Sequence, residues 1–197
     1  SSGFSAESKK NNLSDMANII TWRTRNGIPV YAILTSDLPV LRVAVVKDAG
    51  SVRDGASYGL ADLTASLLNQ GTLNQNAIQI ASIFERLGAL YSAQTNSDMS
   101  IFTLQTLTRP NLLNPALDEF HKVMTQPSFS ENSILLQKRL MISSLKNELQ
   151  HSSKVAEEAL LKAIYKDHPY GHLPEGSVES IQKIDRPEVI KFYQDYY

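Results

Sequence analysis

The chain has 197 residues, of which 42% are hydrophobic and 20% charged, values that are ordinary for a globular protein with a substantial core. Its 19 basic and 20 acidic residues give a formal net charge of -1, so there is no electrostatic reason to expect nucleic acid or an anionic membrane as a partner. Cysteine is absent, which excludes disulfides, thiolate zinc sites and cysteine nucleophiles, and no apolar run is long enough to span a membrane.

The first part of the chain predicts a leader followed by strands. Residues 1–16 are rich in Ser, Asn and Lys, and we expect a flexible leader there, before a domain formed by residues 17–197. The dipeptide Asn26-Gly27 predicts a hairpin turn, because both residue types tolerate positive φ. Strands are expected at 22–24, 30–34 and 40–46, and a small-residue loop at 49–59.

The rest of the chain predicts helices and one further hairpin. Leu60, Leu63 and Leu67 lie on one face of a helix that Gly71 ends. The other expected elements are a helix at 75–87, strands at 90–95 and 99–107, and helices at 112–124, 130–150, 153–165, 178–183 and 185–197. Because strands gather early, helices gather late and no βαβ alternation is present, the pattern predicts an α+β fold with a mostly antiparallel sheet packed against helices.

One segment carries a specific resemblance. Residues 59–72, from Gly-Leu-Ala-Asp62 to Gly-Thr, resemble the opening helix of the pitrilysin/insulinase family of zinc peptidases, which includes the mitochondrial processing peptidases. In that family the same frame surrounds an inverted zinc motif, His-x-x-Glu-His. Further similar segments follow the family order, namely Val43 to Asp54, Leu87-Gly88-Ala89, His168-Pro169-Tyr170-Gly171 with Gly176, and Phe192 to Tyr197.

The resemblance covers roughly residues 20–197 and implies a known architecture. It is that of the first α+β domain of the family, a fold like those of LuxS and the processing peptidases. The family pattern also implies that the chain is truncated before the last strand of this domain and lacks the second domain.

The resemblance also implies which positions would form the zinc site. Asp62 stands in the first His position, Ala65 in the general-base position and Ser66 in the second His position, and the distal Glu position falls near Ser144 or its neighbour Ser143. Alanine cannot accept a proton, a serine hydroxyl is a poor zinc ligand, and one carboxylate does not hold zinc against water. Neither Ser66 nor Ser144 has the surroundings of a nucleophile. We therefore expect no catalytic residue, metal or cofactor in this chain, and zinc only in an active partner.

Two other interpretations of these residues stay open. In the first, the resemblance is chance and Asp62, Ser66 and Asn69 form the solvated face of an amphipathic helix. In the second, Glu148, one helical turn beyond Ser144, provides the distal carboxylate after a slip in register. An ordinary exposed glutamate is the favoured interpretation of Glu148.

The four histidines do not form an evident site. His168 and His172 are four residues apart, but the Pro and Gly between them exclude a shared helix face, so a structural turn is favoured over a metal pair. His121 and His151 have no acidic or His partner at ligand spacing, and surface or core-edge roles are expected for them.

These observations lead to one favoured function and two alternatives. We expect a catalytically inactive subunit of a zinc metallopeptidase complex, with a catalytically active homologous subunit and an extended peptide substrate as partners. The first alternative is an active zinc metalloendopeptidase with atypical ligands such as Asp62 and Glu148. The second is a stand-alone peptide-binding protein. A periplasmic or other envelope setting in a bacterium is the favoured location.

Overall fold

The computed structural model describes residues 19–35, 38–150, 152–166 and 168–197. The expected leader at 1–16 lies outside these ranges. The chain divides into two compact units, residues 1–39 and residues 40–197. Within the described ranges, no helix combines the length and the apolar character that crossing a lipid bilayer requires.

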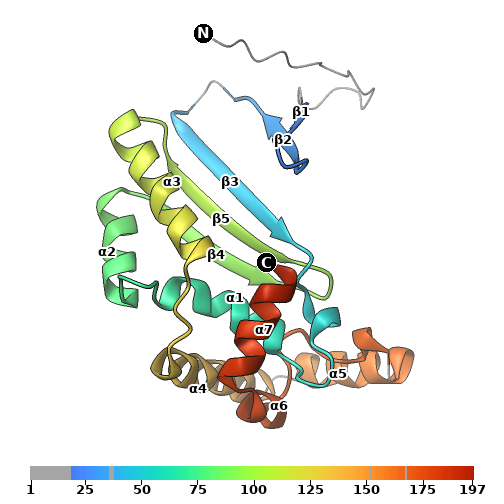
Figure 1. The fold of residues 1–197 in the computed structure, drawn as a ribbon. Coiled ribbons are helices and arrows are strands. Elements are labelled where there is room, and N and C mark those ends of the chain that lie inside the picture. The colour runs from blue at the N-terminus through green and yellow to red at the C-terminus, as the bar shows by residue number, and fades with distance from the viewer. Residues whose placement is uncertain (1–18, 36–37, 151, 167) are drawn as a thin grey trace. The chain divides into compact units, whose positions relative to one another are not determined.

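The first unit contains the predicted hairpin. Strand β1 (Ile19–Arg23) pairs antiparallel with β2 (Pro29–Ile33), and Ile19 stands opposite Ile33 (Figure 1). In the turn, the backbone N–H of Gly27 donates to the carbonyl of Thr24 at 2.9 Å, and Gly27 adopts a φ of 81°. The Asn-Gly prediction is confirmed.

The second unit is built around a three-stranded antiparallel sheet. In spatial order its strands are β3 (Val40–Lys47), β5 (Ser100–Leu107) and β4 (Leu90–Thr95) (Figure 1). The register places Val43 and Tyr91 on either side of Leu104, which is fully buried. Alternate residues of each strand therefore form an apolar face toward the helices, and the predicted sheet packed against helices is confirmed.

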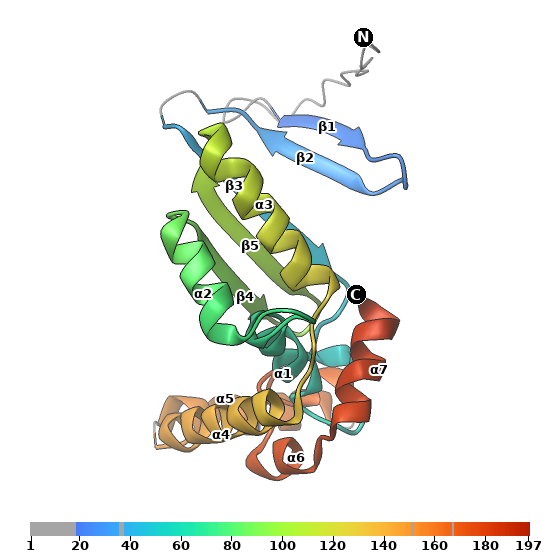
Figure 2. The same ribbon diagram turned by 60° about the vertical axis from the view of Figure 1, so that its left-hand side comes forward.

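Seven helices accompany this sheet in the described residues. They are α1 (Leu60–Leu67), α2 (Ala77–Arg86), α3 (Pro110–Thr125), α4 (Glu131–Glu148), α5 (Ser152–Tyr165), α6 (Val178–Lys183) and α7 (Arg186–Tyr196), with 3-10 turns at Ser51–Arg53, Leu68–Gln70 and Pro169–Gly171. The side chains of Asn76, Ser130, Ser177 and Asp185 cap α2, α4, α6 and α7. Helix α3 packs on β5 and α2 on β4 (Figure 2). The predicted helices are confirmed to within a few residues at each end.

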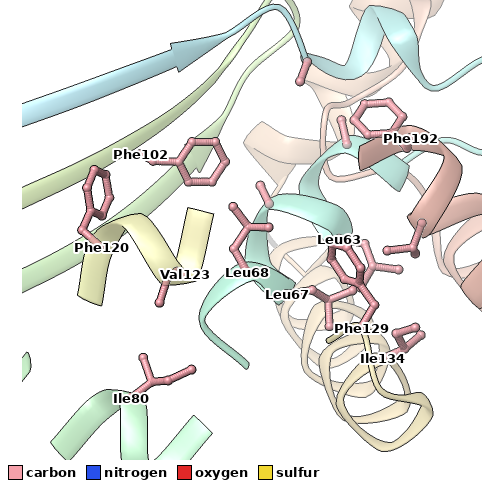
Figure 3. Close-up of a cluster of buried hydrophobic side chains, with 14 of the residues drawn as sticks. Leu63, Leu67, Leu68, Ile80, Phe102, Phe120, Val123, Phe129, Ile134 and Phe192 are labelled. Carbon is pink, nitrogen blue, oxygen red and sulfur yellow. The ribbon is translucent and has the colours of Figure 1, made fainter. Parts of the chain in front are cut away.

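Helix α1 lies at the centre of the packing. Leu63, Leu67 and Leu68 are almost completely buried, and they belong to the core that Phe102, Phe129 and other large side chains complete (Figure 3). The helix contacts α4, α7 and β4. Since burial of one leucine side chain contributes about 1.5–3 kcal/mol, these contacts fix α1 firmly in the domain.

Candidate functional site

The start of α1 is held by a carboxylate from the preceding loop. Gly59 takes the cap position with a φ of 94° and has no side chain to accept a hydrogen bond. Asp54 takes over this role, because its carboxylate oxygens accept the backbone N–H groups of Gly59 and Ala61, both at 2.8 Å. Burial raises the pKa of Asp54 to about 7, against the lowering effect of these two N–H groups and with a further raising effect from Asp62.

A later loop lies directly against the same helix start. A Cβ atom at Gly176 would clash with the carbonyl oxygen of Tyr58, so only glycine allows this approach. The hydroxyl of Ser180 donates to that carbonyl at 2.7 Å, and the rings of Tyr58 and His172 stack with centroids 4.0 Å apart. These contacts bring Glu175, which precedes Gly176, beside the start of α1.

The three family positions on α1 have different surroundings. Ala65 is part of the core and only 2% exposed. Ser66 is half-buried, and its hydroxyl donates to the carbonyl of Leu63 at 2.8 Å. Asp62 is half-buried and lines a pocket of about 400 Å³. The other residues lining this pocket are Gln94, Thr95, Asn96 and Ile101.

One interpretation of the residues on α1 and the turn that follows it is wrong. Asp62, Ser66 and Asn69 do not form a solvated face, because all three are half-buried where neighbouring elements cover the helix. The side chain of Glu148 is 42% exposed, as the favoured interpretation of this residue expects. It accepts a hydrogen bond from the exposed Ser144 at 3.1 Å, and its charge acts on Asp62 across the packed α1 and α4.

Glu148 and Glu175 lie close enough to Asp62 for their negative charges to act on it. Burial, and then the negative charges of Glu175 and Glu148, raise the pKa of Asp62 to about 6. The ammonium of Lys154 lies 3.3 Å from Glu175 Oε1 and 4.0 Å from Glu148 Oε2. The sequence did not predict that Lys154 and Glu175 belong to this site. It indicates only that Glu157 lies one helical turn from Lys154.

The raised pKa of Asp62 leads to a pH-dependent prediction. Because the folded chain holds this pKa above its ordinary 3.8, the stability from this group is complete below about pH 4 and is lost as the pH rises through about 6. Asp62→Asn is therefore expected to raise the free energy of unfolding at pH 8 by about 1–2 kcal/mol and to leave it unchanged at pH 4. Urea unfolding at the two pH values measures the difference. Asp118→Asn, at an exposed site on α3, is the control, and equal effects of the two variants would contradict this interpretation.

The histidines that the structure describes take structural places. The ring Nδ1 of His168 accepts the N–H of Tyr170 at 3.2 Å and caps the 3-10 turn, while His172 stacks on Tyr58. The predicted structural turn is confirmed. His121 is exposed on α3, and His151 lies outside the described residues.

The residues at this site do not fit zinc. A zinc site requires three protein ligands, and on α1 only Asp62 offers a suitable atom, since the Ser66 hydroxyl is engaged with a backbone carbonyl. Glu148 and Glu175 share the ammonium of Lys154. Nowhere in the described part of the chain do three His, Asp or Glu side chains converge closely enough to hold a metal ion.

Comparison with known proteins identifies the family. Residues 32–174 match the insulinase family, peptidase family M16. A crystal structure of a peptidase M16 inactive domain from Pseudomonas fluorescens superposes with a TM-score of 0.85 at 32% identity, covering 89% of this chain and 43% of that one. The non-peptidase homolog YmxG of Helicobacter pylori is 26% identical over 138 residues, which are 70% of this chain and 32% of that protein. Pitrilysin shares the fold, with a TM-score of 0.79 at 18% identity over 95% of this chain and 20% of that one.

These matches settle one of the alternatives. The chain spans less than half of the length of each of these relatives. The family match includes the whole of α1 and its frame, so the interpretation of the resemblance as chance is wrong. The chain belongs to the insulinase family, peptidase family M16.

Proposed function

We propose that the protein is a non-catalytic member of the family and acts as a subunit of a zinc metallopeptidase complex. The observation that carries this proposal is Ala65, a buried methyl group in the general-base position, between Asp62 and Ser66 in the two His positions. A site with this composition can neither bind zinc nor activate water. The names of two relatives support the proposal, since one is described as an inactive domain and the other as a non-peptidase homolog.

The proposed partner is a homologous subunit with an intact His-x-x-Glu-His motif. Such a partner supplies the zinc and the general base, and the present subunit contributes to peptide binding. Its contribution then comes from shape and backbone hydrogen bonds and not from a metal ion.

The proposed peptide site is the free edge of β4. Among the strands of the described residues, β4 pairs only with β5, so its other edge offers unpaired backbone N–H and C=O groups. The pocket beside Asp62 begins where this strand ends, at Gln94 and Thr95. An extended peptide can add to the edge as a further strand and place one side chain in the pocket.

Reconstitution tests the subunit proposal. The full-length protein is mixed with the homologue from the same genome that carries His-x-x-Glu-His, and the mixture is analysed by size-exclusion chromatography and by cleavage of a fluorogenic casein peptide. Co-elution and faster cleavage than with the homologue alone are expected. Separate elution and an unchanged rate would contradict the proposal, whereas peptide binding by the isolated protein without a partner would favour a stand-alone binding protein.

A matched pair of variants locates peptide binding in the reconstituted complex. Gln94→Arg is expected to raise KM for the casein peptide about tenfold, because the larger side chain fills the pocket at the end of β4. Gln105→Arg makes the same change on β5, opposite Leu90 at the other end of β4, and is expected to leave KM unchanged. Equal effects would count against the β4 edge as the peptide site.

A further inference from the structure

Lys154 contacts more carboxylates than any other cation among the ion pairs of the described residues. Its ammonium lies 3.3 Å from Glu175 Oε1, 3.4 Å from Glu157 Oε2 and 4.0 Å from Glu148 Oε2. Its side chain is 19% exposed, whereas Lys183, in an ordinary surface pair with Glu179, is 72% exposed. The side chains of its partners Glu175, Glu148 and Glu157 are 38%, 42% and 55% exposed, so the lysine is largely shielded from water while the carboxylates are partly exposed.

The carboxylates around Lys154 come from separate segments of the chain. Glu148 is the last residue of α4, Glu157 lies on α5, and Glu175 lies in the loop that Gly176 holds against the start of α1. Burial and the negative charges of Glu175 and Glu148 raise the pKa of Asp62 on α1. One ammonium group thus contacts carboxylates from the end of α4, from α5 and from the Glu175 loop, which lies against the start of α1.

We propose that Lys154 is the permanent counter-ion of Glu148, Glu157 and Glu175 and holds α5 to the end of α4 and to the Glu175 loop in place of a metal ion. In a zinc-binding site, the cation neutralises the carboxylates and ties their helices together. Here the ligands do not fit zinc, and the cation is part of the chain itself. The inference does not depend on the proposed subunit role, because it concerns the folding of this chain alone.

The charges indicate how strongly the arrangement depends on Lys154. Burial lowers the pKa of Lys154, but the adjacent Glu175 and Glu157 more than offset this effect, so the pKa is raised and the ammonium form is favoured. One oxygen of Glu175, Oε2, is buried without a hydrogen-bond partner. Loss of Lys154 leaves Glu148, Glu157 and Glu175 without their shared positive charge, which is expected to destabilise the fold more than loss of a single exposed pair.

Thermal unfolding of the chain at pH 7.5 and low salt tests this proposal. Lys154→Met keeps much of the side-chain volume but removes the charge, and it is expected to lower Tm by about 5 °C. Lys154→Arg keeps the charge and is expected to retain most of the wild-type Tm. Lys162→Met, at an exposed site on the same helix, is the matched control and is expected to change Tm by less than about 1 °C.

A double-mutant cycle with Glu175→Gln separates charge from packing. If Lys154 acts as a counter-ion, Lys154→Met lowers Tm by at most half as much in the Glu175→Gln background as in the wild type. An equal loss in both backgrounds, or a Tm unchanged by Lys154→Met, overturns the proposal. If the single variant Lys154→Met does not fold, a folded double variant supports the counter-ion role, and a double variant that is also unfolded overturns it.

Discussion

Replacement of Asp54 by Ala is expected to lower the free energy of unfolding by about 2–4 kcal/mol. The carboxylate is only 4% exposed and accepts the N–H groups of Gly59 and Ala61, so its removal leaves two donors at the start of α1 without a partner. Because α1 is the central helix of the core, loosening its first turn affects the whole second unit. Urea unfolding followed by circular dichroism measures the change.

The control for this prediction is another aspartate of the same loop region. Asp48 forms an ion pair with Arg53 at 2.6 Å, but its side chain is 72% exposed. Asp48→Ala is therefore expected to lower the free energy of unfolding by less than about 1 kcal/mol. Equal losses for the two variants would show that Asp54 does not anchor α1.

Restoring a glutamate at the general-base position is expected to destabilise the protein and not to activate it. Ala65 is 2% exposed among the core residues, so Ala65→Glu buries a carboxylate without a partner and overfills the core. The free energy of unfolding is expected to fall by about 3 kcal/mol or more, measured by urea unfolding at pH 7.5.

The same substitution at an exposed helical alanine provides the comparison. Ala163 lies exposed on α5, and Ala163→Glu is expected to change the free energy of unfolding by less than about 0.5 kcal/mol. If Ala65→Glu were as stable as the wild type, position 65 would have room for a catalytic base. The conclusion that the core fills this position would then be wrong.

The sequence predicted the elements well because their signals are local. Asp185 lies at the expected start of the last helix, Gly71 follows the first one, and Asn26-Gly27 forms the hairpin turn. The resemblance of residues 59–72 to the family could be recognised for the same reason, because these residues are consecutive in the sequence. Expected and observed elements therefore differ only by a few residues at their ends.

The surroundings of the site were not predictable in the same way. Lys154 and Glu175 are 21 residues apart, and the loop that carries Glu175 approaches Tyr58 closely because Gly176 has no Cβ atom. The role of Asp54 as a cap for α1 depends on the positive φ of Gly59, which turns the loop back toward the carboxylate. Such contacts depend on tertiary structure, and a single sequence gives no direct signal for them.

The most direct test of a non-catalytic role is the zinc content of the full-length protein, purified without chelators and assayed in parallel for cleavage of a fluorogenic casein peptide. With Asp, Ala and Ser in the positions of the zinc ligands and the base, zinc far below one ion per chain and no cleavage are expected. One zinc ion per chain that supports cleavage, and is lost together with activity in Asp62→Asn, would contradict this account and establish a peptidase with atypical ligands.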